Sequence, residues 1–316
     1  PYGVSYNSYL IDDEMVALVD TVDICYFEVY LRKIKQVIGE RPINYLIINH
    51  MEPDHSGSIR LIKQHYPEII IVGNKQTFGM IEGFYGVTGE QYLVKEGDFL
   101  ALGHHKLRFY MTPMVHWPET MMTFDETDGV LFSGDGFGCF GTVDGGFLDT
   151  RINVDKYWGE MVRYYSNIVG KYGSPVQKAL QKLGGLPISA ICSTHGPVWT
   201  ENIAKVIGIY DRLSRYDADE GVVIAYGSMY GNTEQMAEAI AEELSAQGVK
   251  NIVMHNVTKS HPSYIIADIF RYKGLIIGSP TYSNQIFPEV EALLSKILLR
   301  EVKGRYLGYF GSFAWA

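Results

Sequence analysis

The sequence predicts an α/β protein with two domains, in which a mixed α and β domain precedes a doubly wound parallel sheet. Three observations indicate this fold class. The chain has 316 residues, enough for two cores at roughly 100–200 residues per domain. Hydrophobic residues make up 47% and charged residues 20%, a balance typical of packed proteins. Strand-like and helix-like patterns alternate regularly only in the last third of the chain.

Short apolar runs broken by Gly, Asp and Pro dominate the first domain, and only some segments have helical spacing. A hairpin is expected around the turn at 12–14, and Phe27–Ile38 reads as an amphipathic helix. One or two tyrosine-rich helices are expected within Val154–Leu183. The expected strands are Tyr9–Ile11, Met15–Val19, Ile43–Ile48, Ile69–Val72, Lys106–Thr112, Val130–Ser133 and Ile188–Cys192.

The segment Asp211–Gly221 is polar, lacks apolar periodicity and is the expected linker. It places the domain boundary near residue 217, with domains at 1–216 and 217–316. Beyond the linker the chain alternates strand and helix, which predicts a parallel sheet with helices on both faces. The expected order is strand Val222–Ala225, helix Thr233–Gln247, strand Ile252–His255, helix Ser263–Tyr272, strand Leu275–Gly278, helix Pro288–Leu299 and strand Tyr306–Phe310.

Charge and cysteine content exclude several classes of protein. The net charge of −9 disfavours binding to nucleic acid or to anionic membranes, and no apolar run approaches the roughly 18 residues of a membrane helix. The three cysteines are widely spaced without a CxxC pair, which indicates a reducing, cytoplasmic location. The chain opens without Met and stops soon after an apolar segment, so we interpret it as a fragment, truncated at both ends, with an incomplete second domain.

The segment NHMEPDHSGS carries four ligand-type side chains directly after the expected strand Ile43–Ile48. Residues two apart in extended chain share a side, so His50, Glu52 and Asp54 can face one space, and His55 can join them where the chain turns. A charged surface loop is the plainer alternative. Three further candidates, each just beyond an apolar run, favour a metal site instead; they are His116, Asp135 and His195.

Strand ends on one edge of a sheet meet in space, so these seven residues could hold two metal ions. Taken singly, His116 or His195 would more often be a hydrogen-bonded structural residue; the joint pattern argues otherwise. The carboxylate of Asp135 has two oxygens and can bridge two ions. Imidazole and carboxylate ligands without thiolate suit a redox-capable metal such as iron, as in di-iron carboxylate proteins.

A phosphate-binding loop is expected at YGSMYGNTEQMA, where Ser228, Asn232 and Thr233 lie at a strand-to-helix turn. Backbone N–H groups and hydroxyls at a helix N-terminus bind phosphate without a cation. An ordinary capped helix start is the alternative, and the absence of GK[ST] argues against an NTP-binding loop. The loops GSPTYSNQIFP and GSFAWA fall on the same carboxyl edge, where open α/β sheets bind ligands.

The motif HxExDH, the Asp of FSGDGFG, the His of STHG and these three loops resemble the flavodiiron proteins over nearly the whole chain. The resemblance implies a metallo-β-lactamase-like αββα sandwich followed by a flavodoxin-like doubly wound sheet. It implies that His50, Glu52 and His116 hold one iron, that Asp54, His55 and His195 hold the other, and that Asp135 bridges them. In some members the residue matching His55 does not bind metal. Hydrolases of the wider superfamily are expected to carry His at the position of Glu52.

The resemblance also implies an FMN site built from the three loops. The phosphate would be held by Ser228, Met229, Tyr230, Gly231, Asn232 and Thr233. One side of the flavin ring would be lined by Pro280, Thr281, Tyr282, Ser283, Asn284 and Gln285. The other side would be lined by Ser312, Phe313, Ala314 and Trp315. Because the third loop ends with the chain, FMN is expected to bind this fragment weakly or not at all.

With FMN and two Fe as cofactors, the implied activity is that of an oxidoreductase that reduces O2 to water, NO to N2O, or both. The implied electron donor is a rubredoxin-like protein or a flavin reductase. The implied assembly is a head-to-tail homodimer, or a dimer of such dimers. Two alternatives remain, namely a zinc-dependent hydrolase of the metallo-β-lactamase fold fused to flavodoxin, and an electron-carrying flavoprotein with an inactive metal domain.

Overall fold

The computed structural model describes residues 3–313 and divides into two compact units. The first contains the chain up to Met161 together with Ser174–Gly208, and the second contains Val162–Gly173 and the chain from Ile209 onward. These units are discontinuous in sequence, and the domain boundary near residue 217 stays a prediction. Among the described residues, no helix has the length and apolar character needed to cross a bilayer.

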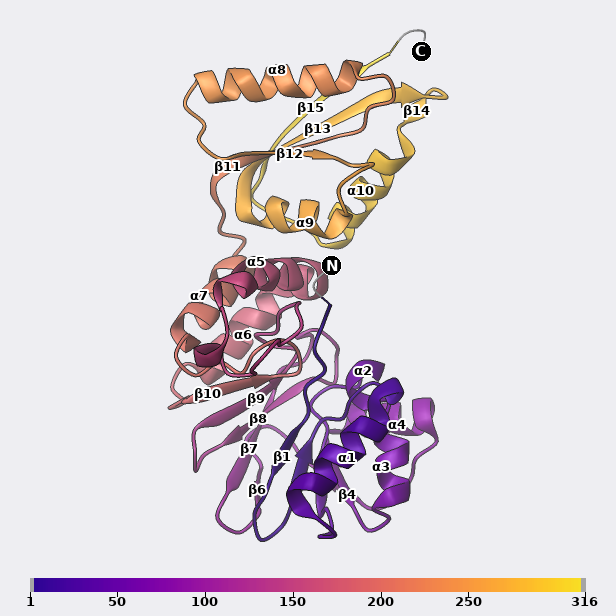
Figure 1. Ribbon diagram of the computed structural model, residues 1–316, viewed down its shortest axis with the longest axis vertical. Coiled ribbons are helices and arrows are strands. Elements are labelled where there is room, and N and C mark those ends of the chain that lie inside the picture. Colours follow the sequence, from indigo (N-terminus) through magenta and orange to yellow (C-terminus); the bar gives the residue numbers. More distant parts are fainter. Residues whose placement is uncertain (1–2, 314–316) are drawn as a thin grey trace. The chain divides into compact units, whose positions relative to one another are not determined.

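The first unit contains two five-stranded sheets (Figure 1). The side chains on their inner faces share one hydrophobic core. In the first sheet, β1 and β2 are antiparallel and the remaining pairs are parallel. Its strands are β1 (Tyr9–Ile11), β2 (Ala17–Val19), β3 (Tyr45–Ile47), β4 (Ile70–Gly73) and β5 (Gln91–Leu93). The second sheet, in spatial order, contains β10 (Ala190–Ser193), β9 (Val130–Gly134), β8 (Met121–Asp125), β7 (Lys106–Met111) and β6 (Phe99–Ala101).

Helices cover the outer face of the first sheet, which gives the expected sandwich. In α1 (Phe27–Ile38) the buried residues Phe27, Tyr30, Leu31, Ile34 and Ile38 recur at helical spacing and form one stripe. They share a core with side chains of α3 (Ile59–His65) and α4 (Lys75–Tyr85). Beside the second sheet lies α6 (Gly173–Leu183), whose Lys182 Nζ donates to the Met111 carbonyl at 2.6 Å.

The second unit contains the strand order β12, β11, β13, β14, with β15 paired to β13. Parallel pairs join β12 (Ile252–Asn256), β11 (Asp219–Tyr226), β13 (Tyr272–Tyr282) and β15 (Tyr306–Ser312). The helices between these strands are α8 (Asn232–Ala246), α9 (Pro262–Arg271) and α10 (Pro288–Leu299), and Figure 1 shows α8 on the opposite side of the sheet from α9. This arrangement is the predicted doubly wound sheet.

Several local predictions need correction. The expected linker is mostly structured, because α7 (Ile203–Ser214) continues to Ser214 and β11 begins at Asp219. The sheet is not wholly parallel, since β14 (Gln285–Ile286) returns antiparallel to β13. The segment expected to hold one or two tyrosine-rich helices contains α5 (Asp155–Tyr164) and α6, but α6 has no tyrosine; a π-helical turn at Tyr165–Val169 and a 3-10 turn at Gly170–Tyr172 lie between them.

Candidate metal centre

Three of the predicted residues follow strands that run in the same direction. The strand β8 is antiparallel to both β7 and β9, and β9 is parallel to β10. Consequently β7, β9 and β10 end on one edge of the second sheet. His116 lies in the loop after β7, Asp135 directly follows β9, and His195 lies two residues after β10. The topology therefore gathers these side chains at the edge that the sequence predicted.

The HxExDH segment follows β3 and is held by buried hydrogen bonds. Asp20 Oδ1 accepts from the backbone N–H groups of Asn49 at 2.8 Å and His50 at 3.3 Å. The short helix α2 (Pro53–Ser56) then begins, with Pro53 in its first turn, where a missing N–H costs no helical bond. This turn brings His55 to the same side as the residues before it.

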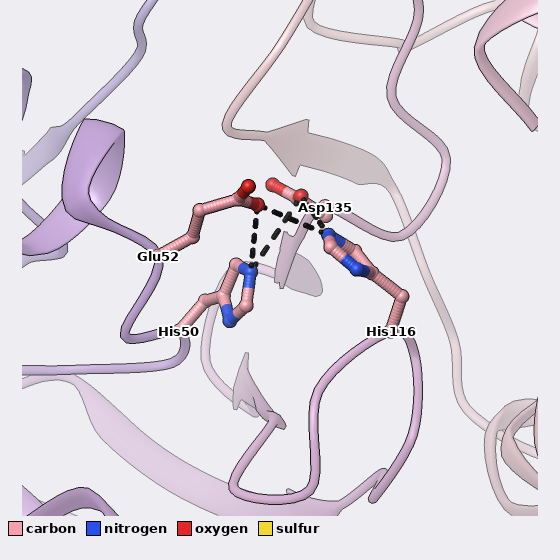
Figure 2. Close-up of side chains that lie close together, drawn as sticks. All are labelled: His50, Glu52, His116 and Asp135. Atoms are coloured by element: carbon pink, nitrogen blue, oxygen red, sulfur yellow. Dashed lines mark hydrogen bonds and ion pairs between the residues drawn. The ribbon is translucent and has the colours of Figure 1, made fainter. Parts of the chain in front are cut away.

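The first group of candidate ligands contains His50, Glu52, His116 and Asp135 (Figure 2). Glu52 Oε2 lies 3.4 Å from His50 Nε2 and 3.1 Å from His116 Nε2. Asp135 Oδ2 lies 3.0 Å from His116 Nε2 and 3.7 Å from His50 Nε2. Two imidazole nitrogens and two carboxylates therefore face one point.

The second group contains Asp54, His55 and His195. Asp54 Oδ2 lies 3.3 Å from His55 Nε2 and 3.4 Å from His195 Nε2. The other oxygen of Asp135, Oδ1, lies 3.0 Å from His55 Nε2, so one carboxylate faces both groups. The two groups coincide with the ligand sets implied by the resemblance, and His55 lies among them.

Mutual contacts shift the acidity of these side chains. Burial lowers the pKa of His50, but its hydrogen bonds to Glu119 and Glu52 and the charge of Asp135 raise it to about 10. Burial raises the pKa of Glu52, yet its hydrogen bonds to His116 and His50 lower it to about 2. Burial likewise acts against ionisation of Asp135, whose pKa is nevertheless held well below its ordinary value by His55 and His116. Glu52 and Asp135 are thus ionised at neutral pH, as metal ligands must be.

The residues present fit two metal ions. His55 Nε2 and His195 Nε2 lie 3.1 Å apart, and both atoms face the carboxylates of Asp54 and Asp135. Asp54 Oδ1 is buried without a hydrogen-bond partner in the described part of the chain. A carboxylate shared between two imidazole and carboxylate groups matches the donor chemistry of iron.

Sequence reasoning missed three side chains that contact this centre. Glu119 accepts from His50, Asp20 accepts from the backbone of the HxExDH segment, and Thr194 Oγ1 donates to Asp135 Oδ1 at 2.6 Å. Thr194 adjoins a predicted ligand and Asp20 directly follows a predicted strand, so their positions were weak signals. The one sequence signal for Glu119 was its position three residues after His116.

A second site lies in the flavodoxin-like unit, where a cavity of 390 Å³ opens beside the N-terminus of α8. Gly231 takes the left-handed conformation just before this helix, and its N–H donates to Ser228 Oγ at 3.1 Å. Thr233 Oγ1 lies 3.0 Å from Ser312 Oγ, which joins the first and third predicted loops. Hydroxyls and helix N–H groups suit a phosphate here, so the pocket fits FMN.

Most of the predicted FMN-binding residues line this cavity. Ser283 and Asn284 have positive φ at the tip of the β13–β14 hairpin, the geometry of a tight hairpin turn. Gly231 and Gln285 do not line the cavity, and Ala314 and Trp315 lie outside the described residues. The lining is Ser228, Met229, Tyr230, Asn232, Thr233, Pro280, Thr281, Tyr282, Ser283, Asn284, Ser312 and Phe313.

Comparisons with known families agree with this division. Residues 4–196 match the family described as ODP family beta lactamase, and residues 224–315 match the family described as flavodoxin. The first match covers more than half of the chain. All seven candidate metal ligands lie within it, and the candidate phosphate loop lies within the second.

Similar proteins cover the whole chain. The rubredoxin oxygen:oxidoreductase of Desulfovibrio gigas is 31% identical with a TM-score of 0.96, over 100% of this chain and 80% of that one. The flavodiiron protein of Giardia intestinalis is 29% identical with a TM-score of 0.96, over 99% and 77%. An anaerobic nitric oxide reductase flavorubredoxin of Vibrio vulnificus is 33% identical over 99% of this chain. The chain spans 64% of the length of that curated relative.

Proposed function

We propose, from the premise that the chain belongs to the flavodiiron protein family, that it reduces O2 to water, NO to N2O, or both, with electrons from FMN. The observation that carries this proposal is the pair of ligand groups that share Asp135 and include Glu52. With Glu52 the first group offers two carboxylates, which favours iron over the zinc of a hydrolase that would have histidine there.

Two Fe supply one-electron changes beside a bound gas, and FMN supplies electrons singly or in pairs. The side chains of the two ligand groups would hold the two Fe and shield them from solvent. The side chains of His50, His55 and Asp135 are at most 1% exposed, whereas those of Glu52 and Asp54 are 37% and 24% exposed. The centre therefore opens to solvent on the side of Glu52 and Asp54, where a small gas and protons can enter.

Anaerobic turnover of the iron- and FMN-loaded full-length protein tests the activity. Chemically reduced FMN should be oxidised by O2 with four electrons and four protons per O2, or by two NO with two electrons and two protons per N2O. His116→Ala should abolish both reactions because it removes a ligand of the first group. Two bound zinc ions with hydrolase activity would favour the hydrolase alternative, and a protein that accepts electrons but reduces neither gas would favour the electron carrier.

The proposal includes a rubredoxin-like or flavin-reductase electron donor and a head-to-tail homodimer in which FMN of one chain serves the irons of the other. Full-length chains carrying His116→Ala can be unfolded and refolded together with chains whose phosphate loop is broken by Thr233→Asp, because the added carboxylate repels the FMN phosphate. Each variant alone should be inactive, and verified heterodimers should regain part of the activity; inactive heterodimers would contradict this assembly. The cytoplasmic location expected from the widely spaced cysteines is part of the same proposal.

A further inference from the structure

Glu119 is a completely buried carboxylate that contacts the metal centre without belonging to either ligand group. Its Oε1 accepts from His50 Nδ1 at 2.8 Å and from the Met51 N–H at 2.9 Å. Asn74 Nδ2 donates to the Glu119 backbone carbonyl at 2.6 Å and fixes the loop that carries it. Its Oε2 has no hydrogen-bond partner among the described residues. Burying a polar side chain with so few partners is costly, so its contact with His50 calls for an explanation.

The contact determines which nitrogen of His50 can bind metal. Glu119 Oε1 already accepts from the Met51 N–H and is therefore an acceptor, so Nδ1 must carry the proton that it donates to Glu119. Nε2 then faces Glu52 and Asp135 and is the nitrogen available to a metal ion. A carboxylate behind a ligating imidazole fixes its ring orientation and makes it a stronger donor to the metal.

The imidazoles of the second ligand group have other surroundings at Nδ1. His195 Nδ1 lies 2.7 Å from the Ser5 carbonyl oxygen, which carries no net charge. His55 Nδ1 is buried without a hydrogen-bond partner in the described part of the chain. Nδ1 of His50 thus faces a carboxylate, whereas Nδ1 of His195 faces a neutral carbonyl oxygen. The outer contacts therefore make the two metal positions unequal, although their ligand atoms are of the same kinds.

We propose that Glu119 is a positioning residue that fixes the Nδ1–H tautomer of His50 and makes the metal position at His50, Glu52 and His116 the tighter of the two. The inference rests on the proposed function, because it requires that the two groups bind metal. The inference also predicts the order in which the two positions bind metal. Metal offered below two equivalents should enter the position backed by Glu119 first.

Single-site backgrounds measure the two positions separately. His195→Ala disables the second group, and His116→Ala disables the first. Each metal-free protein is titrated anaerobically with Co2+, whose visible absorption reports binding, with and without Glu119→Gln. Glutamine keeps the shape of the side chain but removes its charge. We expect Glu119→Gln to weaken Co2+ binding about 10- to 100-fold in the His195→Ala background and less than about twofold in the His116→Ala background.

A control variant separates this effect from a general loss of structure. Asp268 Oδ2 pairs with His255 Nε2 at 2.9 Å in the second unit, so Asp268→Asn breaks a similar carboxylate–imidazole contact away from the centre. It should leave Co2+ affinity unchanged in both backgrounds. Equal weakening by Glu119→Gln in both backgrounds, or none in either, would overturn the inference while leaving the proposed function standing. A wild-type chain that binds no metal would overturn both.

The wild-type protein provides a second test, in which the protonation of the native His50 ring is observed directly. In the Zn2+-loaded chain labelled with 15N-histidine, NMR should show His50 protonated at Nδ1, with a slowly exchanging proton. The resonance is assigned by its loss in His50→Gln. A His50 ring protonated at Nε2 and bound through Nδ1 would refute the role of Glu119.

Discussion

Replacing Asp135 with Asn should destabilise the metal-free chain and remove both metals. The asparagine keeps the shape of the side chain but loses the charge that lies 3.0 Å from both His55 Nε2 and His116 Nε2. Asp135 is 2% exposed, so solvent does not replace the lost interaction. Removing one partner from a buried ion pair costs about 3–5 kcal/mol. We expect a loss of about 3 kcal/mol in unfolding free energy, because the histidines can become neutral in the variant.

The pH dependence of this loss follows from the raised histidine pKa values. A histidine whose pKa is raised by folding contributes stability that is fully present below its unfolded pKa, near 6.5. That contribution disappears as the pH rises through the folded pKa, which for His50 is about 10. Because Asp135 is one cause of the raised pKa values of His50 and His116, the substitution should cost more at pH 6 than at pH 10.

Urea unfolding of the metal-free protein at both pH values measures the stability change, and elemental analysis after anaerobic reconstitution measures metal content. Asp149→Asn is the matched control, since Asp149 is 3% exposed and accepts from Thr200 and Asn202 away from the ligand groups. The control should lose stability but keep two metals per chain. An Asp135→Asn protein that also kept two metals would refute the assignment of a shared carboxylate.

Three further outcomes are expected. In the full-length protein, Thr233→Val should weaken FMN binding about tenfold, since a hydrogen bond to a charged group is worth roughly 1.5–3 kcal/mol; flavin fluorescence quenching measures it, and Thr258→Val, at an exposed position, should change nothing. Metal uptake by the metal-free protein at pH 8 should release protons to a pH indicator, because the pKa of His50 is about 10 before binding and the ligating imidazole must be neutral; uptake without proton release would contradict that value. Trp199→Ala should cost about 3–5 kcal/mol of unfolding free energy, because Trp199 is fully buried and donates to the Phe137 carbonyl; a chemical denaturation midpoint within error of the wild type would argue against this packing.

Elements with a clear local pattern were predictable. The spacing of Phe27–Ile38 gave a helix with the observed bounds, and the strands before His50, Asp135 and His195 were placed within a few residues. Elements without a clear local pattern, such as one helix and one strand of the first unit, were not predicted. The helix α4 contains Gly79 and Gly83, which weaken helix propensity. The strand β8 is buried on both faces, so it shows no alternation of polar and apolar residues.

The sequence by itself determined the types of ligand and their positions after strands, because strand ends and residue spacing are local properties of the chain. Only the tertiary structure decided which residues share a point in space. Asp135 faces both groups because β9 lies between β8 and β10 in the sheet, and Glu119 meets His50 across 69 residues of sequence. Such contacts depend on how sheets and loops pack, and a local pattern carries no information about a partner so distant along the chain.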